Sequence, residues 1–192
     1  MNLKGAASSK SKKLTIVTVS SEMVPYAKTG GLADVAGTLP TVLSELGHTC
    51  YSFLPLYKKV KEEWYARAAK FSEFSVPISG QRELATIWQY EPQRNHTVFF
   101  VENDGYFNRD GIYGTSKGDF PDNWARYGFF CQAVLETLRS ADLSRPDIIH
   151  CHDWQASLVA VYLKEKFSAD TCFKSTKTLL TIHNMAYQGL FD

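Results

Sequence analysis

The sequence predicts an α/β protein with an open, mostly parallel, Rossmann-like sheet. Two observations lead to this prediction. Strand-like apolar runs alternate with helix-like patterns near both ends of the chain, as in parallel β-α-β units. The middle of the chain instead has the spacing of antiparallel strands. At 192 residues the chain can form one domain with a sizeable core, and it contains no internal repeat.

The first β-α-β unit lies near the amino terminus. Residues 14–20 (LTIVTVS) are β-branched and mostly apolar, as expected for a buried parallel strand. Apolar residues then recur at helical spacing after Leu32, although Pro40 should kink or split this helix. Gly47 should end it, because glycine favours the backbone conformation that follows a helix. Residues 48–54 (HTCYSFL) form the next expected strand.

The middle of the chain predicts antiparallel pairing. Residues 57–70 are charged and favour a surface helix. Residues 74–78 and 83–90 have the pattern of a β-hairpin around a turn at 79–82. Residues 96–101 (HTVFFV) form another apolar strand, closed by turn-forming residues.

The last third returns to alternating strands and helices. After a glycine- and aromatic-rich loop at residues 106–118, Asp122 should cap a helix that runs to about Ser140. A short buried strand, an amphipathic helix and a further strand are then expected at residues 147–151, 155–167 and 177–182.

Composition narrows the class of protein. The net charge of +1 gives no reason to expect nucleic acid or an anionic membrane as a partner. No apolar run approaches the roughly 18 residues of a membrane span. The four cysteines show no paired spacing, so we expect reduced thiols and a cytoplasmic protein. Residues 1–13 are interpreted as a flexible tail, and a plastid transit peptide stays open because the first acid is Glu22.

The loop after the first strand contains Lys28-Thr29-Gly30-Gly31. Adjacent glycines let a backbone approach a ligand closely, and the following helix terminus favours an anion. Lys28 adds a point charge suited to a phosphate oxygen. The order of residues matches neither a P-loop nor a G-x-G-x-x-G loop. Spacing alone therefore favours phosphate binding and a plain turn with a solvated lysine equally.

A second polar segment, His150-Cys151-His152-Asp153-Trp154, ends the strand at 147–151. Alternation along a strand places Cys151 opposite both histidines, so zinc binding is disfavoured and His150 is expected to pack in the core. His152, Asp153 and Trp154 can face a cleft, where a carboxylate beside an aromatic ring suits a sugar. The alternative is a helix-capping aspartate beside a core tryptophan.

The third polar segment follows the last strand. His183 and Asn184 could donate hydrogen bonds to hydroxyls or to a leaving oxygen, or simply be satisfied by the loop backbone. Residues 106–114, together with 122–124, are consistent with a wall for an acceptor substrate and equally with an aromatic mini-core.

Taken in order, these motifs resemble a known family. The segments SSEMVPYAKTGGLADVAGTLP, YFNRDGIYG, HCHDWQA and TIHNMAYQG are similar to those of the ADP-glucose-type glycogen and starch synthases. The resemblance runs from about Leu14 to the last residue. It implies half of a GT-B architecture, in which two Rossmann-like domains face a cleft. It also implies a retaining glucosyltransferase that moves glucose from ADP-glucose to the non-reducing end of an α-1,4-glucan, with no metal and no cofactor.

The resemblance implies roles for residues of the first loop. Lys28 would contact the diphosphate of ADP-glucose, with the backbone of Gly30 and Gly31 beside it. Asp34 would organise that loop or a polar group in the cleft and is counted with the catalytic residues.

Other roles fall on the later motifs. Asp153 and His183 would lie near the transferred glucose as catalytic residues, with His183 bonded to a sugar hydroxyl. Asn184 and Trp154 are expected to bind substrate beside them. The chemistry would be electrostatic, stabilising the departing diphosphate and a cationic glucosyl centre.

The resemblance also implies that residues 14–192 are an incomplete amino-terminal catalytic domain. The second Rossmann-like domain of this family binds most of the nucleotide, so the chain is expected not to turn over alone. Two alternatives remain open. The chain could be a stand-alone glucan-binding or regulatory module, or its donor could be UDP-glucose.

Overall fold

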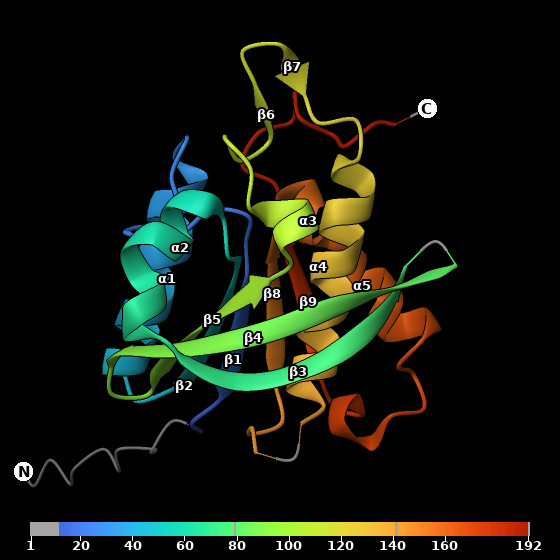
Figure 1. Ribbon diagram of the computed structural model, residues 1–192. Helices are drawn as coiled ribbons and strands as arrows, with labels where there is room; N and C mark the ends of the chain where they lie inside the picture. The colour runs from blue at the N-terminus through green and yellow to red at the C-terminus, as the bar shows by residue number, and fades with distance from the viewer. Residues whose placement is uncertain (1–11, 79, 141, 192) are drawn as a thin grey trace, which may run out of the picture.

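The computed structural model describes residues 12–78, 80–140 and 142–191 (Figure 1). The expected tail at residues 1–13 lies almost wholly outside them. Its main sheet has seven strands in the order β3-β4-β5-β2-β1-β8-β9. Strands β5, β2, β1, β8 and β9 pair in parallel, and β3, β4 and β5 pair antiparallel. The predicted open, mostly parallel α/β sheet is confirmed.

The first unit consists of β1 (Thr15–Val19), α1 (Leu32–Glu45) and β2 (Thr49–Pro55). Pro40 was predicted to kink or split this helix. The split is wrong, because α1 runs through Pro40 as a single helix. Its buried face includes Ala36, Gly37 and Pro40, so packing outweighs the one backbone hydrogen bond that proline removes. Gly47 has a φ of 87°, as the predicted helix stop requires.

The middle of the chain forms α2 (Lys58–Trp64), a 3-10 turn (Tyr65–Arg67) and a long hairpin of β3 (Ala69–Ile78) and β4 (Gln81–Gln93), followed by β5 (His96–Glu102). Both strands of this hairpin extend beyond the predicted ranges of 74–78 and 83–90, so fewer residues connect them than predicted. The loop expected at 106–118 also contains order: α3 (Asp104–Phe107) enters it, and β6 (Gly114–Thr115) pairs with β7 (Gly118–Asp119).

Helix α4 (Asn123–Leu138) lies between the hairpin side of the sheet and α5 (Asp153–Glu165) (Figure 1). It is therefore buried around most of its circumference. Asp122 occupies the N-cap position of this helix, as predicted, but its side chain makes no capping hydrogen bond. Its carboxylate instead accepts two hydrogen bonds from the Arg109 guanidinium, at 2.8 and 2.7 Å.

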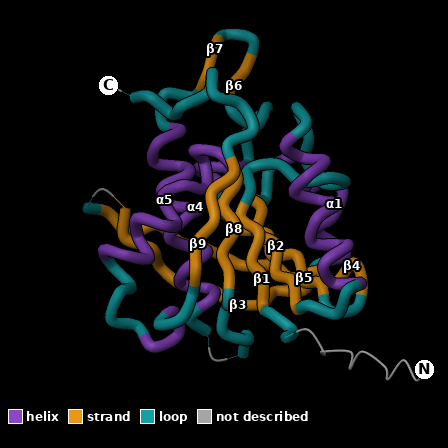
Figure 2. The backbone as a smooth tube through the Cα atoms, turned by 180° about the vertical axis from the view of Figure 1, so that it is seen from behind, coloured by secondary structure: helices purple, strands orange, loops and turns teal. Residues whose placement is uncertain are grey.

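The last unit is β8 (Ile148–His152), α5, a 3-10 turn (Thr171–Phe173) and β9 (Lys177–Thr181). Strand β2 lies on one side of β1 and β8 on the other, so the winding direction reverses between β1 and β8. Seen from behind, α1 stands at one side of the strands and α5 at the other (Figure 2). Open sheets bind ligands outside the carboxyl ends of their strands at such a reversal.

Candidate active site

The three polar segments come together at one edge of the sheet. Residues 20–31 follow β1, Asp153 follows β8, and His183 follows β9. Because β1, β8 and β9 are adjacent and parallel, their carboxyl ends meet at the same edge. This edge contains the reversal point, so sheet topology alone selects it as the candidate site.

Glu22 holds the loop that contains the two glycines. It is buried, and its carboxylate accepts hydrogen bonds from the Thr29 amide, from the Thr29 hydroxyl at 2.7 Å and from the Gly30 amide at 3.1 Å. The Tyr113 hydroxyl also donates to it, at 2.6 Å. A carboxylate with these donors ties the loop after β1 to the loop before β6. Glu22 is not among the predicted site residues, and its one signal in the sequence is its place just beyond a buried strand.

Lys28 and Asp34 form an ion pair at the loop surface. The Lys28 Nζ lies 2.6 and 2.7 Å from the two Asp34 carboxylate oxygens. Both side chains are about half exposed, at 50% and 54%, so the pair adds little to stability. Asp34 thus contacts Lys28 directly, and its role in catalysis stays a prediction.

The glycines leave space beside the loop. A Cβ atom built on Gly30 or Gly31 would meet nothing within 4 Å, so this backbone is open to approach. The amide of Gly30 is already bonded to Glu22. Gly31 is the N-cap of α1 and supplies no side-chain cap, while the Asp34 amide donates to the Gly31 carbonyl oxygen at 3.2 Å.

Three histidines gather at the ends of β8 and β9. The ring centroids of His150 and His152 lie 4.1 Å apart, and those of His152 and His183 lie 5.1 Å apart with the ring planes at 20°. His152 Nδ1 lies 2.8 Å from His183 Nε2, and His150 Nε2 lies 2.7 Å from the Thr181 hydroxyl. Burial, followed by the two neighbouring histidines, lowers the pKa of His152 to about 3, so it is neutral near pH 7. Burial also lowers the pKa of His150.

The segment at 150–154 was predicted to bury His150 and to place Cys151 on the opposite side of the strand. His150 is buried as expected. Cys151 is buried too, and it lies near the Cys131 thiol, whose pKa is raised well above its ordinary value by burial and then by Cys151. In the part of the chain that the structure describes, no cluster of three or more His, Cys, Asp or Glu side chains could hold a metal ion.

Asp153 positions the loop that carries His183. Its carboxylate accepts the His183 backbone amide at 2.6 Å. Asp153 has a φ of 58°, a left-handed conformation that is uncommon outside glycine. The alternative role as helix cap was wrong, because His152 occupies the cap position and Asp153 begins α5. The strained backbone instead aims the carboxylate across to the loop after β9.

Trp154 lies in an aromatic pocket. Its ring packs edge-on against Tyr127 and Phe191, at 5.3 and 5.2 Å between centroids. The adjoining pocket has a volume of about 290 Å³ and is lined by Asp119, Asn123, Trp154, 186–190 and Phe191. Aromatic faces with nearby amide and carboxylate groups are the surfaces that sugars bind.

Asn184 has a local partner. Its side-chain oxygen accepts the Ala186 amide at 2.9 Å, which shapes the exposed turn after His183. The mid-chain loop contributes to the aromatic core and to the loop after β1, and its role as an acceptor wall stays a prediction. Phe107 is buried against Tyr57, whereas Tyr113 reaches the site through Glu22.

The predicted residues thus form two groups. Lys28, Asp34 and the two glycines make the loop after β1, and Asp153 fixes His183 at the ends of β8 and β9. Within residues 12–78, 80–140 and 142–191, no hydrogen bond or ion pair joins Lys28 directly to His183.

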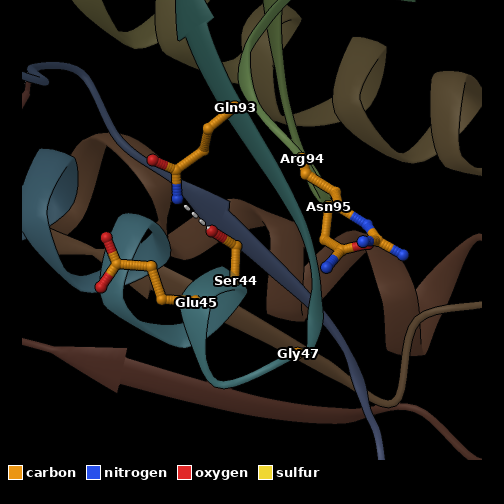
Figure 3. Close-up of a pocket in the computed structure, with 6 residues that line it drawn as sticks. All are labelled: Ser44, Glu45, Gly47, Gln93, Arg94 and Asn95. Carbon is orange, nitrogen blue, oxygen red and sulfur yellow. Dashed lines mark hydrogen bonds between the residues drawn. The ribbon is translucent and has the colours of Figure 1, made fainter.

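A larger pocket, of about 630 Å³, lies away from this edge, where the amino ends of β2 and β5 meet (Figure 3). Gln93 points at the Ser44 hydroxyl and donates a hydrogen bond to it, and Glu45, Gly47, Arg94 and Asn95 complete the lining. None of the predicted site residues lines it, and it has no aromatic face for a sugar.

An open α/β sheet with a polar, glycine-bearing loop at its reversal point defines a class of nucleotide- and phosphate-binding proteins. Comparison with known families identifies the particular one. The model of the starch synthase catalytic domain matches residues 15–192, and the chain belongs to this family. Among the described residues, no helix has both the length and the apolar character to cross a membrane.

Relatives agree with this assignment. The chain is 43% identical over 178 residues to a glycogen synthase of Geotalea daltonii and 41% identical to one of Geotalea uraniireducens. These alignments cover 93% of this chain and 36% of each relative. A solved catalytic domain of starch synthase IV from Arabidopsis thaliana, bound to ADP and acarbose, superposes with a TM-score of 0.76 at 30% identity. That match covers 93% of this chain and 35% of the other, so the chain spans about a third of its relatives' length.

Proposed function

We propose that this chain is the amino-terminal part of the catalytic unit of a retaining glucosyltransferase that extends an α-1,4-glucan from ADP-glucose. The observation that carries the proposal is the meeting of the Lys28 loop, Asp153 and His183 at the reversal point of the sheet. The glycogen synthase relatives support the reaction, and the starch synthase bound to ADP and acarbose supports a nucleotide and a glucan-like ligand. We also propose that the reaction takes place in the cytoplasm, or in a plastid in a plant host.

In this proposal the loop after β1 receives the diphosphate. Lys28 leaves Asp34 for a phosphate oxygen, and Gly31 contributes its backbone together with the first amides of α1. Gly30 contributes close approach, since Glu22 already accepts its amide. These groups stabilise the charge on the leaving diphosphate, and the new bond forms on the same face of the sugar.

The glucosyl side is assigned to the later loops. His183 donates a hydrogen bond to a hydroxyl of the transferred glucose, and Asp153 holds the backbone of His183. Trp154 and its pocket receive part of the glucan, with Asn184 shaping the turn beside it. Because the chain spans about a third of its relatives, we propose that transfer needs residues beyond this segment.

A stand-alone glucan-binding module is the second candidate, favoured by the aromatic pocket beside Trp154. Calorimetric titration of the chain with ADP-glucose and with a linear α-1,4-glucan oligosaccharide separates the two. The first proposal predicts ADP-glucose binding that Lys28→Ala weakens by about 10-fold, as expected for one charge-assisted contact. Lys58→Ala is the matched control, since Lys58 forms a similar exposed pair with Asp110. Glucan binding without any ADP-glucose binding would favour the module.

A further inference from the structure

The histidines at the ends of β8 and β9 form an ordered cross-strand pattern. His150 bonds to Thr181 at the end of β9, and His152 bonds to His183, two residues farther along both segments of the chain. The His152 ring lies between the other two rings. It is fully buried, whereas His183 is partly exposed at the candidate site. His152 therefore supports His183 from the inside of the protein.

His152 carries a single proton. Its burial, reinforced by the rings of His150 and His183, lowers its pKa to about 3, so near neutral pH the ring is uncharged. One ring nitrogen of a neutral histidine donates and the other accepts. Nδ1 faces His183 Nε2 at 2.8 Å, and Nε2 is buried with no hydrogen-bond partner among the described residues.

The unpartnered nitrogen decides which atom holds the proton. A proton on Nε2 would bury an N–H group without an acceptor, and such orphaned donors are rarer in proteins than unpaired acceptors. A proton on Nδ1 is donated to His183 and leaves only a lone pair unsatisfied. The favoured arrangement is therefore His152 Nδ1–H donating to His183 Nε2.

We propose that His152 is a positioning residue that holds the ring proton of His183 on Nδ1, so that His183 offers an N–H donor to an oxygen of the ligand. Since His183 Nε2 accepts from His152, this nitrogen carries no proton, and the ring proton must reside on the other nitrogen. The donor then suits a sugar hydroxyl acting as acceptor. The ligand assignment rests on the proposed function, whereas the proton position rests on the histidine contacts alone.

Two-bond ¹H–¹⁵N correlation spectra of the full chain near pH 7.5 test this proposal, because they distinguish the two neutral forms of each histidine ring. The chain has five histidines, which single substitutions assign. We expect both His152 and His183 to be protonated on Nδ1. A His183 ring protonated on Nε2 would overturn the proposal.

Variants test the dependence on His152. His152→Asn places an amide N–H near the former position of His152 Nδ1 and should keep the ring proton of His183 on its Nδ1. His152→Leu removes the donor, so His183 should become a mixture of the Nδ1-protonated and Nε2-protonated forms. Thr181→Val, which removes the partner of His150, is the matched control and should leave His183 unchanged. An unaltered His183 in His152→Leu would contradict the proposal, and the wild-type spectrum decides if that variant does not fold. These spectra need no ligand, so they are independent of the calorimetric test of function.

Discussion

At the scale of single residues, the site depends on buried or partly buried polar groups that position its exposed ones. Glu22 fixes the loop of Lys28, Asp153 fixes the backbone of His183, and His152 supports its ring. Lys28, Asp153 and His183 could be predicted as candidates because their motifs are local, and their roles stay predictions. Glu22 could not be predicted, because the most distant partner of its carboxylate, Tyr113, lies 91 residues away along the chain.

Replacing Glu22 by glutamine tests its role in the loop. Glutamine turns one acceptor toward the Thr29 and Gly30 amides into a donor, so we expect a loss of about 2 kcal/mol in the free energy of unfolding. Hydrogen exchange at those two amides should also accelerate. The exposed Glu63→Gln is the control. Unchanged exchange in Glu22→Gln would show that the carboxylate does not hold the loop.

Three buried histidines, His96, His150 and His152, have a lowered pKa and make stability depend on pH. Burial lowers the pKa of His96 to about 4 and that of His152 to about 3, below the ordinary value of 6.5. The unfolded chain therefore binds protons below pH 6.5 that the folded chain does not, and stability falls as the pH falls from 6.5 to about 4. Between about pH 7.5 and about pH 5, the lowered pKa of each of these two rings should reduce the free energy of unfolding by about 2 kcal/mol.

Urea denaturation at the two pH values measures this loss. In His152→Asn one titrating ring is absent, so the difference between the two pH values should shrink by about half of the two-ring total. If wild type and variant lost equal stability, the depressed pKa of His152 would be refuted.

At the scale of elements, apolar runs and turn residues predicted nearly every strand of the main sheet and the longer helices that pack on it. The errors came from residues whose tertiary partners outweigh local preference. Pro40 lies within an unbroken helix because its face is buried, and the Asp122 side chain bonds to Arg109 instead of capping α4. Helix α4 was predicted as an element, but its burial between the hairpin and α5 depends on non-local packing that no local pattern reveals.

Gly37 should be essential to the packing of α1. A Cβ atom there would lie against the Val24 carbonyl oxygen and 2.5 Å from Val24 Cγ2. We expect Gly37→Ala to lose about 2 to 3 kcal/mol of unfolding free energy, although alanine is the better helix former.

Gly128→Ala in α4 is the matched comparison for this prediction. Its Cβ atom would meet Ile78 Cδ1 and the Tyr162 hydroxyl at an ordinary 3.4 Å. Stability should stay level or rise by up to about 1 kcal/mol. Thermal or urea denaturation of both variants measures the contrast, and equal effects would show that close approach to Val24 is unimportant.

At the scale of the whole molecule, the fold and its family could be predicted from the motifs, whereas the contacts that hold each half of the site could not. Lys28 and His183 lie on different loops. Glu22 ties the loop of Lys28 to Tyr113, and His152 bonds to His183. The outer strand β9 also exposes Leu179 and Leu180, at 51% and 47%. An exposed apolar edge of this kind favours association, so the chain should self-associate at high concentration, as analytical ultracentrifugation would show.

The most direct test is transfer of radiolabelled glucose from ADP-glucose to glycogen by a chimera. In this chimera, residues 15–191 replace the matching segment of the Geotalea daltonii glycogen synthase, which is 43% identical. We predict glucan extension by the chimera and none by the chain alone. Lys28→Ala and His183→Ala should each lower the rate by about 100-fold or more. A folded chimera without activity, or one indifferent to both substitutions, would contradict the assignment of this edge as a glucosyl-transfer site.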